Sequence, residues 1–411
     1  MTTRTILRAS ALALLIATGP ALADDYGKRY REVVTAYQSE DWPAMQAAAE
    51  RALATRPDYP PMLEIRAMAH ALAGDMRSAV ADLDRVLAMN IPVDLDNPAF
   101  AELPDAARDR LARMVSQLDA PFGAARRYRR GGPGDTVPEG FVLDGEDIII
   151  GSIRNGTLLR ISAEGTSTVH EPAGRHWSIF GMMRRDRELW FVSSDIPEFG
   201  GPAVDTEATT GLFRFDLDSG ELDSHFLPGA KTLGDLWADD SGIYVSDAAG
   251  GVWAFRDAEF EPLVPAGERV NPQGLVMLDG RLIVADYRGG LVSIDPHTGA
   301  RQDIGNASQA SLYGIDGLAT DGRHLYAVQN GIAPARVVRL RFDSASQSIT
   351  SVDMLLMNHP DFDEPTLLRV AHDKLYIMAN SHWNRFDADG QLPADAASTL
   401  SPPTVLEIAL P

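Results

Sequence analysis

RLIVADYRGGLVSIDPHTG, residues 281–299, contains two short apolar runs joined by a glycine turn and followed by a tight polar turn. Apolar and β-branched runs of about five residues, bounded by Gly, Asp and Pro, are typical of β-strands. The first run ends in Asp286, a polar residue after a strand that is otherwise apolar. This stretch predicts a pair of strands with a polar side chain at one end.

The same scheme occurs six times after Pro121, in units of about 38–54 residues. The second strands of the units span residues 148–152, 189–193, 243–247, 282–286, 325–330 and 375–380, and the third strands span residues 156–161, 211–215, 251–255, 290–294, 336–342 and 405–410. Six such units predict a mainly β fold, a six-bladed β-propeller over residues 121–411.

The sixth unit ends at Pro411 after only three strands. We expect its missing outer strand to come from Ala124 to Arg130, just ahead of the first blade. The two ends of the β domain would then close the ring together.

Residues 24–120 have a helical, alanine-rich pattern in which two segments repeat at an offset of 34, as in Asp41 and Asp75 or Leu53 and Leu87. The period and the helix–turn–helix layout resemble tetratricopeptide repeats. A further helix near residues 104–118 completes the stack, or the stack rests on the next domain. The helices are either a docking groove for a protein partner or a structural cap, and we expect the propeller to bind its ligand without them.

The first 23 residues have the features of a secretory signal peptide. Arg4 and Arg8 precede an apolar run over residues 9–17, and Ala21-Leu22-Ala23 forms a small-x-small cleavage site. No later stretch approaches about 18 uninterrupted apolar residues, so we expect no membrane span after cleavage behind Ala23. The expected location is the periplasm or the medium.

Charge and cysteine content exclude several classes of function. The chain has 58 acidic and 37 basic residues, a net charge of −21, and no cysteine. Sequence-independent binding to nucleic acid or to anionic membranes is excluded, because clustered Lys and Arg supply most of that affinity. A disulfide framework, a cysteine–zinc site and a thiol nucleophile are excluded as well.

Polar residues recur where the first strand of a unit starts and where the second strand ends. In a four-stranded antiparallel blade these positions emerge on the same face, so two rings of side chains converge on one mouth of the channel. The strand starts supply Glu139, Asp235, Gln273, Asp316 and Glu364, and the second strands add Ser193, Asp247, Asp286, Asn330 and Asn380.

Four carboxylates and an amide in one narrow funnel would repel one another, and a hard divalent cation would relieve that repulsion. Oxygen ligands favour calcium, with magnesium, manganese and zinc as alternatives. In the other interpretation, these acids cap turns or accept hydrogen bonds from backbone N–H groups at strand ends.

Further candidates stand in loops at the same mouth. Tyr287, Tyr313 and Trp383 would stack on a ligand or pack the loops, and His359 and His382 would move protons or serve as structural hydrogen-bonding residues. The long excursion from Asp195 to Gly211 is rich in glycine and proline, which is typical of a lid or a binding loop.

Residues 124–411 resemble the senescence-marker-protein/gluconolactonase-like six-bladed propellers, whose relatives include strictosidine-synthase-like and paraoxonase-like proteins. Glu139 in Pro-Glu-Gly and Asp316 in Ile-Asp-Gly-Leu match the family motifs. Gln273 in Pro-Gln-Gly-Leu departs from the family asparagine by one methylene, and Gly234-Asp235 stands where the family often has Asn-Asp. The resemblance implies one catalytic divalent metal at the channel mouth.

The expected function is therefore a periplasmic, divalent-metal-dependent hydrolase of lactones or related esters. Glu139, Gln273 and Asp316 would hold the ion, with Asp235 or Glu364 closing the site, and Asp316 or Asp235 would take the proton from a bound water. The alternative is a non-catalytic propeller that binds a ligand or a protein partner, with a structural calcium ion and the helical repeats as a docking surface.

Overall fold

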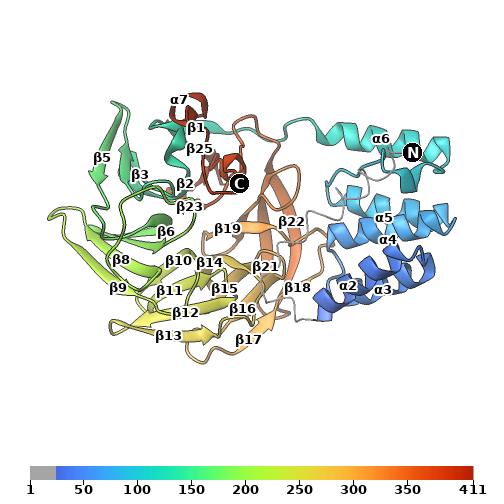
Figure 1. Ribbon diagram of the computed structural model, residues 1–411, viewed down its shortest axis with the longest axis horizontal. Coiled ribbons are helices and arrows are strands. Elements are labelled where there is room, and N and C mark those ends of the chain that lie inside the picture. Colours follow the sequence, from blue (N-terminus) through green and yellow to red (C-terminus); the bar gives the residue numbers. More distant parts are fainter. Residues whose placement is uncertain (1–24, 411) are drawn as a thin grey trace.

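The computed structural model describes residues 25–410, whose strands form six sheets arranged as a six-bladed β-propeller (Figure 1). Pairing within the sheets is antiparallel except for the short strand β18, which pairs parallel with β22. The predicted fold is confirmed. In chain order the blades, numbered 1 to 6, comprise β2–β5 (Pro138–Asp144, Asp147–Ser152, Leu158–Ile161, Thr166–His170), β6–β9 (Ser178–Arg185, Glu188–Ser194, Thr210–Asp216, Leu222–Phe226), β10–β13 (Leu233–Asp239, Gly242–Asp247, Gly251–Arg256, Glu259–Val264), β14–β17 (Pro272–Leu278, Arg281–Asp286, Gly290–Ile294, Arg301–Asp303), β18–β22 (Gly305–Asn306, Ile315–Thr320, Leu325–Gln329, Arg336–Asp343, Ser348–Met357) and β23–β25 (Leu368–Ala371, Lys374–Met378, Thr404–Ala409) with β1 (Arg126–Arg130).

The first full strand of each blade lines the channel. Strands β2, β6, β10, β14, β19 and β23 contact one another in this order, and β24 of the last blade contacts β2 of the first. An apolar cluster fills each space between neighbouring blades. Between blades 6 and 1, Phe141 and Ile150 pack with Met378 and Val405, so the apolar core also closes the ring.

The ring is closed by strand β1, as the sequence predicts. β1 pairs antiparallel with β25, the last strand of the chain, so blade 6 contains both ends of the β domain. Arg126 donates to Glu407 (2.7 Å), and the Tyr128 hydroxyl donates to the Glu146 carbonyl (2.6 Å). The outer strand of blade 6 is therefore held by backbone pairing and by side chains.

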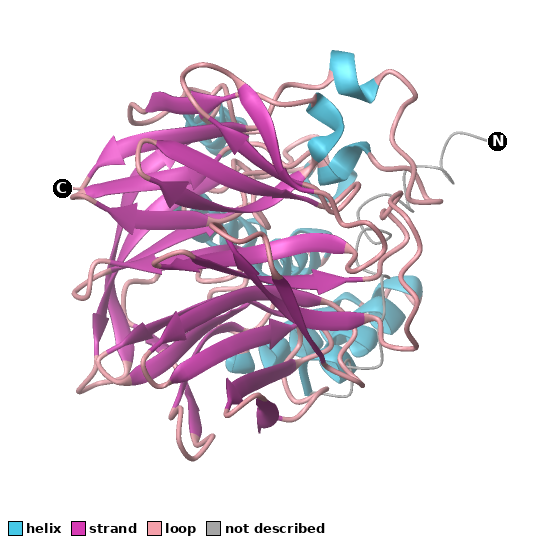
Figure 2. Ribbon diagram, turned by 90° about the vertical axis from the view of Figure 1, so that its left-hand side faces the viewer, coloured by secondary structure: helices cyan, strands magenta, loops and turns pink. Residues whose placement is uncertain are grey.

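The N-terminal helices lie at one side of the body formed by the strands (Figure 1), and most of them stand behind the strands in the view of Figure 2. We call them the helical unit, which comprises α2 (Asp25–Gln38), α3 (Trp42–Thr55), α4 (Pro60–Leu72), α5 (Met76–Ala88) and α6 (Asp105–Leu118) together with η1 (Pro98–Phe100). Asp41 and Asp75, which coincide at the 34-residue offset, occupy the same structural position. Each caps the N-terminus of its helix, α3 or α5, by accepting from a backbone N–H three residues later.

The helical unit is docked on blade 5. Its apolar core includes Tyr313 and Met357 of the propeller. The rings of Tyr59 and Tyr313 meet edge to face with centroids 4.9 Å apart, and Asn306 donates to Asp58 (3.0 Å). Removal of the helices would expose this apolar surface, which argues against the expectation that the propeller is independent of them.

The predicted signal peptide and its cleavage site lie outside the described residues. Among the helices of residues 25–410, none is both long enough and apolar enough to span a membrane.

A buried histidine pair lies between blades 1 and 2. His170 ends β5 and His176 precedes β6, and their rings stack with centroids 5.3 Å apart. Phe191, Phe213 and Phe215 contact the pair, and neither Nε2 atom has a hydrogen-bond partner among the described residues. Burial lowers the pKa of each imidazole from 6.5 to about 4, because charge is disfavoured in this apolar space.

We expect His176→Phe to make the melting temperature less sensitive to acid between pH 6.5 and about 4. In this window the unfolded chain binds a proton at the imidazole and the folded chain does not, so acid weakens the wild-type fold there. Melting scans in steps from pH 7 to pH 4 measure the slope. His297→Gln, which changes an exposed histidine, is the control. Equal slopes in wild type and His176→Phe would show that the pair does not control acid stability.

Candidate functional site

Four carboxylates from four blades gather at the channel mouth. Glu139 of β2, Asp235 of β10 and Asp316 of β19 are buried, with 7%, 1% and 8% exposure. Glu364, which precedes β23, is partly buried. Asp316, Glu364 and Asp235 each raise the pKa of Glu139 through charge repulsion. The acids of the predicted inner ring are therefore close enough to interact strongly.

A β-bulge accompanies each of the three acids that lie within inner strands. The pairing register shifts between Pro138 and Phe141, between Leu233 and Leu236, and between Ile315 and Leu318. Bulges of this kind re-aim side chains and are common at the rims of barrels and beside active sites.

Glycine beside the bulge lets neighbouring inner strands approach. A Cβ atom on Gly317, directly after Asp316, would lie 2.5 Å from the Thr366 carbonyl oxygen of the next blade. Gly140, Gly181 and Gly274 contact the next inner strand in the same way. The inner strands are therefore packed backbone against backbone at the level of the acids.

Burial is the main reason that the pKa values of these acids are raised. It brings the pKa of Asp316 from 3.8 to about 7, with Asp235 and Glu364 adding repulsion and the Asn330 hydrogen bond opposing them. Burial likewise raises the pKa of Glu139 well above its usual range. The pKa values of Asp235 and Glu364 are also raised, chiefly by burial. The ionised form of each acid is therefore less favourable in the fold than in water.

Arg369 is the cation beside this cluster. It lies in β23 of blade 6, donates to the Met182 carbonyl of blade 2 (2.6 Å), and approaches Asp235 of blade 3 (3.5 Å). Its side chain therefore crosses the channel. Neither carboxylate oxygen of Asp235 has a hydrogen-bond partner among the described residues, so this buried acid has acceptor capacity left for a ligand.

Trp383 and Phe180 form an aromatic wall beside Glu139. The indole N–H of Trp383 donates to Glu139 Oε2 (2.6 Å), and the Trp383 ring stacks on Phe180 with centroids 6.1 Å apart. Glu364 accepts from the backbone N–H of Asn384 (2.8 Å). The loop after β24 therefore touches two of the four acids.

Asn330 joins two predicted site residues. Its side-chain nitrogen donates to Asp316 (2.6 Å) and to the Pro365 carbonyl (3.0 Å), while its oxygen accepts from the Tyr287 hydroxyl (2.9 Å). Tyr287, Asn330 and Asp316 thus form one hydrogen-bonded chain at the mouth.

Gly234 and Gln273 fit together in space. A Cβ atom on Gly234 would lie 3.0 Å from the side-chain oxygen of Gln273. The longer Gln273 therefore reaches into space left open by the glycine, and its nitrogen is fixed by donation to Asn271 (2.8 Å). An amide oxygen remains available at the mouth.

The donor set is all oxygen, which fits a hard cation, and Asp235, although paired with Arg369 at 3.5 Å, accepts no close hydrogen bond from the described residues. Within residues 25–410, however, no three His, Cys, Asp or Glu side chains are grouped so that they could hold a metal ion. A cation here would have to use the Gln273 amide oxygen together with carboxylates such as Glu139 and Asp316.

Asp247 and Asp286, at the ends of second strands, are occupied by their own blades. Asp247 accepts from the backbone N–H groups of residues 231, 232 and 249. Asp286 accepts from the N–H groups of residues 270 and 271 and from Arg269. Ser193 accepts similarly from the Trp177 N–H. These bonds correspond to the capping interpretation. They use both carboxylate oxygens of Asp286 but only Oδ1 of Asp247, whose Oδ2 has no hydrogen-bond partner among the described residues.

No family model matches the sequence, and no curated protein matches it. Similar solved structures include a putative oxidoreductase (glucose dehydrogenase) from Thermus thermophilus, with 16% identity and a TM-score of 0.48, covering 69% of this chain and 100% of that chain. A luciferin-regenerating enzyme shows 12% identity and a TM-score of 0.47, covering 71% and 95%. Virginiamycin B lyase from Staphylococcus aureus shows 13% identity and a TM-score of 0.42, covering 62% and 82%. These likenesses carry no information on activity.

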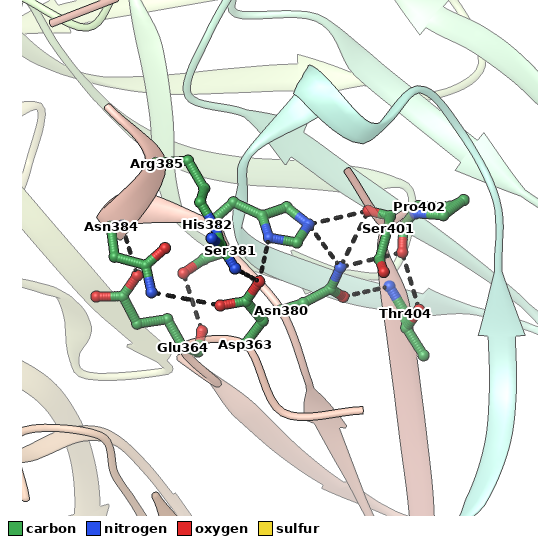
Figure 3. A network of polar contacts seen from close by, with 10 residues as sticks. All are labelled: Asp363, Glu364, Asn380, Ser381, His382, Asn384, Arg385, Ser401, Pro402 and Thr404. Atoms are coloured by element: carbon green, nitrogen blue, oxygen red, sulfur yellow. Dashed lines mark hydrogen bonds and ion pairs between the residues drawn. The ribbon is translucent and has the colours of Figure 1, made fainter. Parts of the chain in front are cut away.

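His382 and Asn380 hold the two ends of the loop between β24 and β25 together (Figure 3). His382, 1% exposed, contacts Asp363 through Nδ1 (3.0 Å) and the Ser401 carbonyl through Nε2 (2.9 Å). Asn380 donates to the Ser401 carbonyl (3.2 Å) and accepts from the Thr404 N–H (2.9 Å). Both side chains are used within blade 6.

His359 and Tyr313 lie away from the acids. His359 accepts from the backbone N–H of Asp361 (3.2 Å), whose side chain pairs with Arg127 of the closing strand β1. Tyr313 packs against Tyr59 of the helical unit. Neither is placed to touch a ligand bound between the four carboxylates.

Two long loops meet at the mouth. Residues 379–403, between β24 and β25, contain η3 (Trp383–Arg385) and α7 (Ala396–Thr399). A Cβ atom on Gly390 would lie 2.7 Å from the Pro197 carbonyl of the excursion between β7 and β8. Ile196 of that excursion and Trp383, Phe386 and Leu392 of the blade 6 loop pack against the same apolar cluster. The sequence indicated the excursion from Asp195 to Gly211, whereas its contact with the blade 6 loop depends on the blades being brought together.

Sequence reasoning missed Arg369 and Phe180 as site residues. Arg369 stands alone between apolar residues in Leu367-Leu368-Arg369-Val370. A charged residue inside an inner strand is a signal for a channel-facing cation. Phe180 has no comparable signal, because its role depends on Trp383 from another blade.

Proposed function

We propose that the protein is a hydrolase of lactones or related esters that uses a divalent cation, calcium by preference, at the channel mouth. The observation that carries the proposal is the cluster of Glu139, Asp235, Asp316 and Glu364, which are drawn from four blades and repel one another. Arg369 offsets only part of their charge. Such a cluster favours a small, hard, doubly charged ion.

Glu139, Gln273 and Asp316 would hold the cation, with Asp235 or Glu364 beside it. A bound divalent cation polarises a carbonyl oxygen and lowers the pKa of a bound water. Burial raises the pKa of Asp316 to about 7 in the cation-free protein, and a divalent cation beside it would lower that pKa and leave a carboxylate able to accept a proton. Asp235, which pairs with Arg369 but accepts no close hydrogen bond from the described residues, is the second candidate base.

The other residues at the mouth would bind and orient the substrate. Trp383 and Phe180 present an apolar wall next to Glu139, suited to the carbon skeleton of a lactone. Asn330 holds Asp316 by a hydrogen bond, and the Tyr287 hydroxyl in turn holds Asn330. Arg369 supports Asp235 from within the channel.

A non-catalytic ligand-binding propeller is the second candidate, and one observation favours it. Glu139, Asp316 and Glu364 are each already held by a neighbour, namely Trp383, Asn330 and Asn384. Acids fixed in this way could bind a cationic or hydrogen-bond-donating ligand without any reaction. In that case the helical unit would serve as a docking surface for a protein partner.

Calcium is expected to raise the melting temperature of the mature protein relative to the same protein in EDTA. A ligand that binds only the folded state stabilises it by about 2.7 kcal/mol at a concentration of 100 Kd. Millimolar calcium, magnesium, manganese and zinc are compared, and calcium should give the largest shift. Superimposable melting curves in EDTA and in calcium would rule out the cation site.

The activity itself is tested by a hydrolysis screen over sugar lactones, acyl lactones and aryl esters, with calcium and with EDTA. Calcium-dependent hydrolysis that is lost in Glu139→Gln but kept in Glu261→Gln supports the proposal. Glu261 lies in the outer strand β13 of blade 3 and undergoes the same chemical change away from the mouth. Calcium binding without hydrolysis of any class would favour the second candidate.

A further inference from the structure

Arg336, at the start of β21, joins the propeller to the helical unit. Its side chain is only 2% exposed. It donates to the carbonyl oxygens of Met89 (2.9 Å) and Asn90 (2.7 Å) in the helical unit, and to those of Pro334 (3.0 Å) and Ala333 (3.4 Å) in its own loop. Among the described residues no carboxylate pairs with it.

Two physical features make Arg336 depend on the helical unit. Met89 and Asn90 follow the C-terminus of α5, where free carbonyls and the negative end of the helix dipole favour a cation. A buried guanidinium without a carboxylate partner depends on such carbonyls, and burial lowers the pKa of Arg336 to about 10. If the helical unit moved away, two of the four acceptors would be lost and the loop would have to rearrange.

The loop that Arg336 anchors carries Asn330, which bonds Asp316. Residues 330–335 connect β20 to β21, so Asn330 and Arg336 stand at the two ends of one short segment. Asn330 donates to Asp316 (2.6 Å) and to the Pro365 carbonyl of blade 6 (3.0 Å). The position of this loop therefore determines the side chain that fixes one of the mouth acids.

Further contacts tie the neighbouring segments to the same place. Gly331 donates its N–H to the Gly314 carbonyl (3.1 Å), and a Cβ atom on Gly314 would lie 2.8 Å from the Gly331 backbone. Tyr313, next in the chain, packs on Tyr59 of the helical unit. The segments 311–314 and 330–335 thus touch each other, and both touch the helices.

The end of α6 makes a second link. The Asn358 side chain donates to the Asp119 carbonyl (2.6 Å), and the Asn358 backbone N–H donates to the Ala335 carbonyl (3.0 Å). Two separate points of the helical unit, after α5 and after α6, therefore hold the same six-residue loop.

We propose that the helical unit is a positioning element of the channel mouth, which acts through Arg336 and the 330–335 loop to hold Asn330 against Asp316. The positional claim stands on the contacts alone, and its consequence for ligand affinity rests on the proposed function. Arg336 touches no acid of the mouth and acts only through other residues.

Hydrogen–deuterium exchange of the full-length mature protein tests the positional claim without any cation. In Arg336→Met, amides of residues 311–316 and 329–336 should exchange about tenfold faster or more, the change expected when a hydrogen bond to a charged group is lost. Residues 138–144 of blade 1 should keep the wild-type rate. Arg336→Lys keeps the positive charge but lacks the several N–H donors of the planar guanidinium group. The amides of residues 311–316 and 329–336 should therefore be protected better in Arg336→Lys than in Arg336→Met.

Arg339→Met is the matched control, because Arg339 lies on the same strand and pairs with Asp353 away from the helices. The Arg339→Met variant should show the same exchange rates as the wild type at residues 311–316 and 329–336. Calcium affinity by calorimetry is the second readout, with about tenfold weaker binding in Arg336→Met and none of this loss in Arg339→Met.

Faster exchange in α5 with unchanged protection of residues 311–316 and 329–336 would overturn the proposal, since docking would then be structural only. If Arg336→Met does not fold, the same comparison is made between Arg336→Lys and the wild type. A wild type that binds no calcium would refute the proposed function but would leave the exchange result to decide the role of the helices.

Discussion

Glu139→Gln and Asp316→Asn are each expected to abolish cation binding and activity while raising the melting temperature of the cation-free protein. Each change removes an anionic ligand, and calcium affinity should fall by about 100-fold or more, equivalent to about 2.7 kcal/mol. Each also removes a buried charge that its neighbours repel, so the cation-free fold should gain stability.

The sign of the pH dependence provides an independent check. The pKa of Asp316 is raised from 3.8 to about 7 in the fold. Between these values the folded chain keeps a proton that the unfolded chain has lost, so this group makes the fold less stable as pH rises through the window. Asp316→Asn should therefore flatten the decline of melting temperature, measured in EDTA, from pH 4 to pH 7.

Calorimetry with calcium and melting in EDTA are measured on both variants, with Glu261→Gln and Asp353→Asn as controls on outer strands. A turn-capping acid would behave in the opposite way, losing roughly 0.5–2 kcal/mol of stability with no effect on binding. Unchanged calcium affinity together with a lowered melting temperature in EDTA would remove Glu139 and Asp316 from the proposed site.

The double change Arg127→Pro with Arg129→Pro is expected to open the ring. Both residues lie in β1, and the pairing register with β25 shifts between them. Proline has no N–H to donate and is poorly tolerated within a paired strand, and we expect a loss of about 3 kcal/mol or more. At about 2–4 °C per kcal/mol, the melting temperature should fall by about 6 °C or more.

Arg127→Ala with Arg129→Ala separates pairing from charge. It removes the same two guanidinium groups, including the exposed Arg127–Asp361 pair, but allows β1 to form. Exposed pairs contribute about 1 kcal/mol or less, so this variant should melt close to the wild type. The proline variant should also aggregate, because β25 would present an unpaired edge. Equal melting of the two double variants would show that β1 is not needed to hold blade 6.

The architecture was predictable because its signals are local. Short apolar strands and glycine turns recur at similar intervals, and the missing strand of the last unit led to Ala124–Arg130 as the closing segment. The inner acids were also predictable, since they stand at strand starts that meet at one mouth. Asp41 and Asp75, which coincide at the 34-residue offset, are equivalent helix caps in the fold.

The partners of individual side chains were not predictable, because they depend on which segments meet in space. Asn330 and Asp286 both stood at the ends of second strands in the sequence, yet Asp286 accepts from its own blade and Asn330 donates to Asp316 of the acid cluster. His382 looked available in a loop, yet it is enclosed by Asp363 and Ser401. The docking of the helices on blade 5 gave no signal, since Arg336 bonds backbone carbonyls that any residue would supply.

The glycines at the inner-strand bulges have a consequence for altering specificity by design. Gly140, Gly181, Gly274 and Gly317 bring adjacent inner strands into backbone contact. The width of the channel is therefore fixed by main-chain packing. An alanine at any of them would push against main chain of the next blade, so the aperture can be neither widened nor reshaped one blade at a time. Libraries aimed at new substrates should therefore leave the inner ring untouched and vary the loops at residues 195–209 and 379–403.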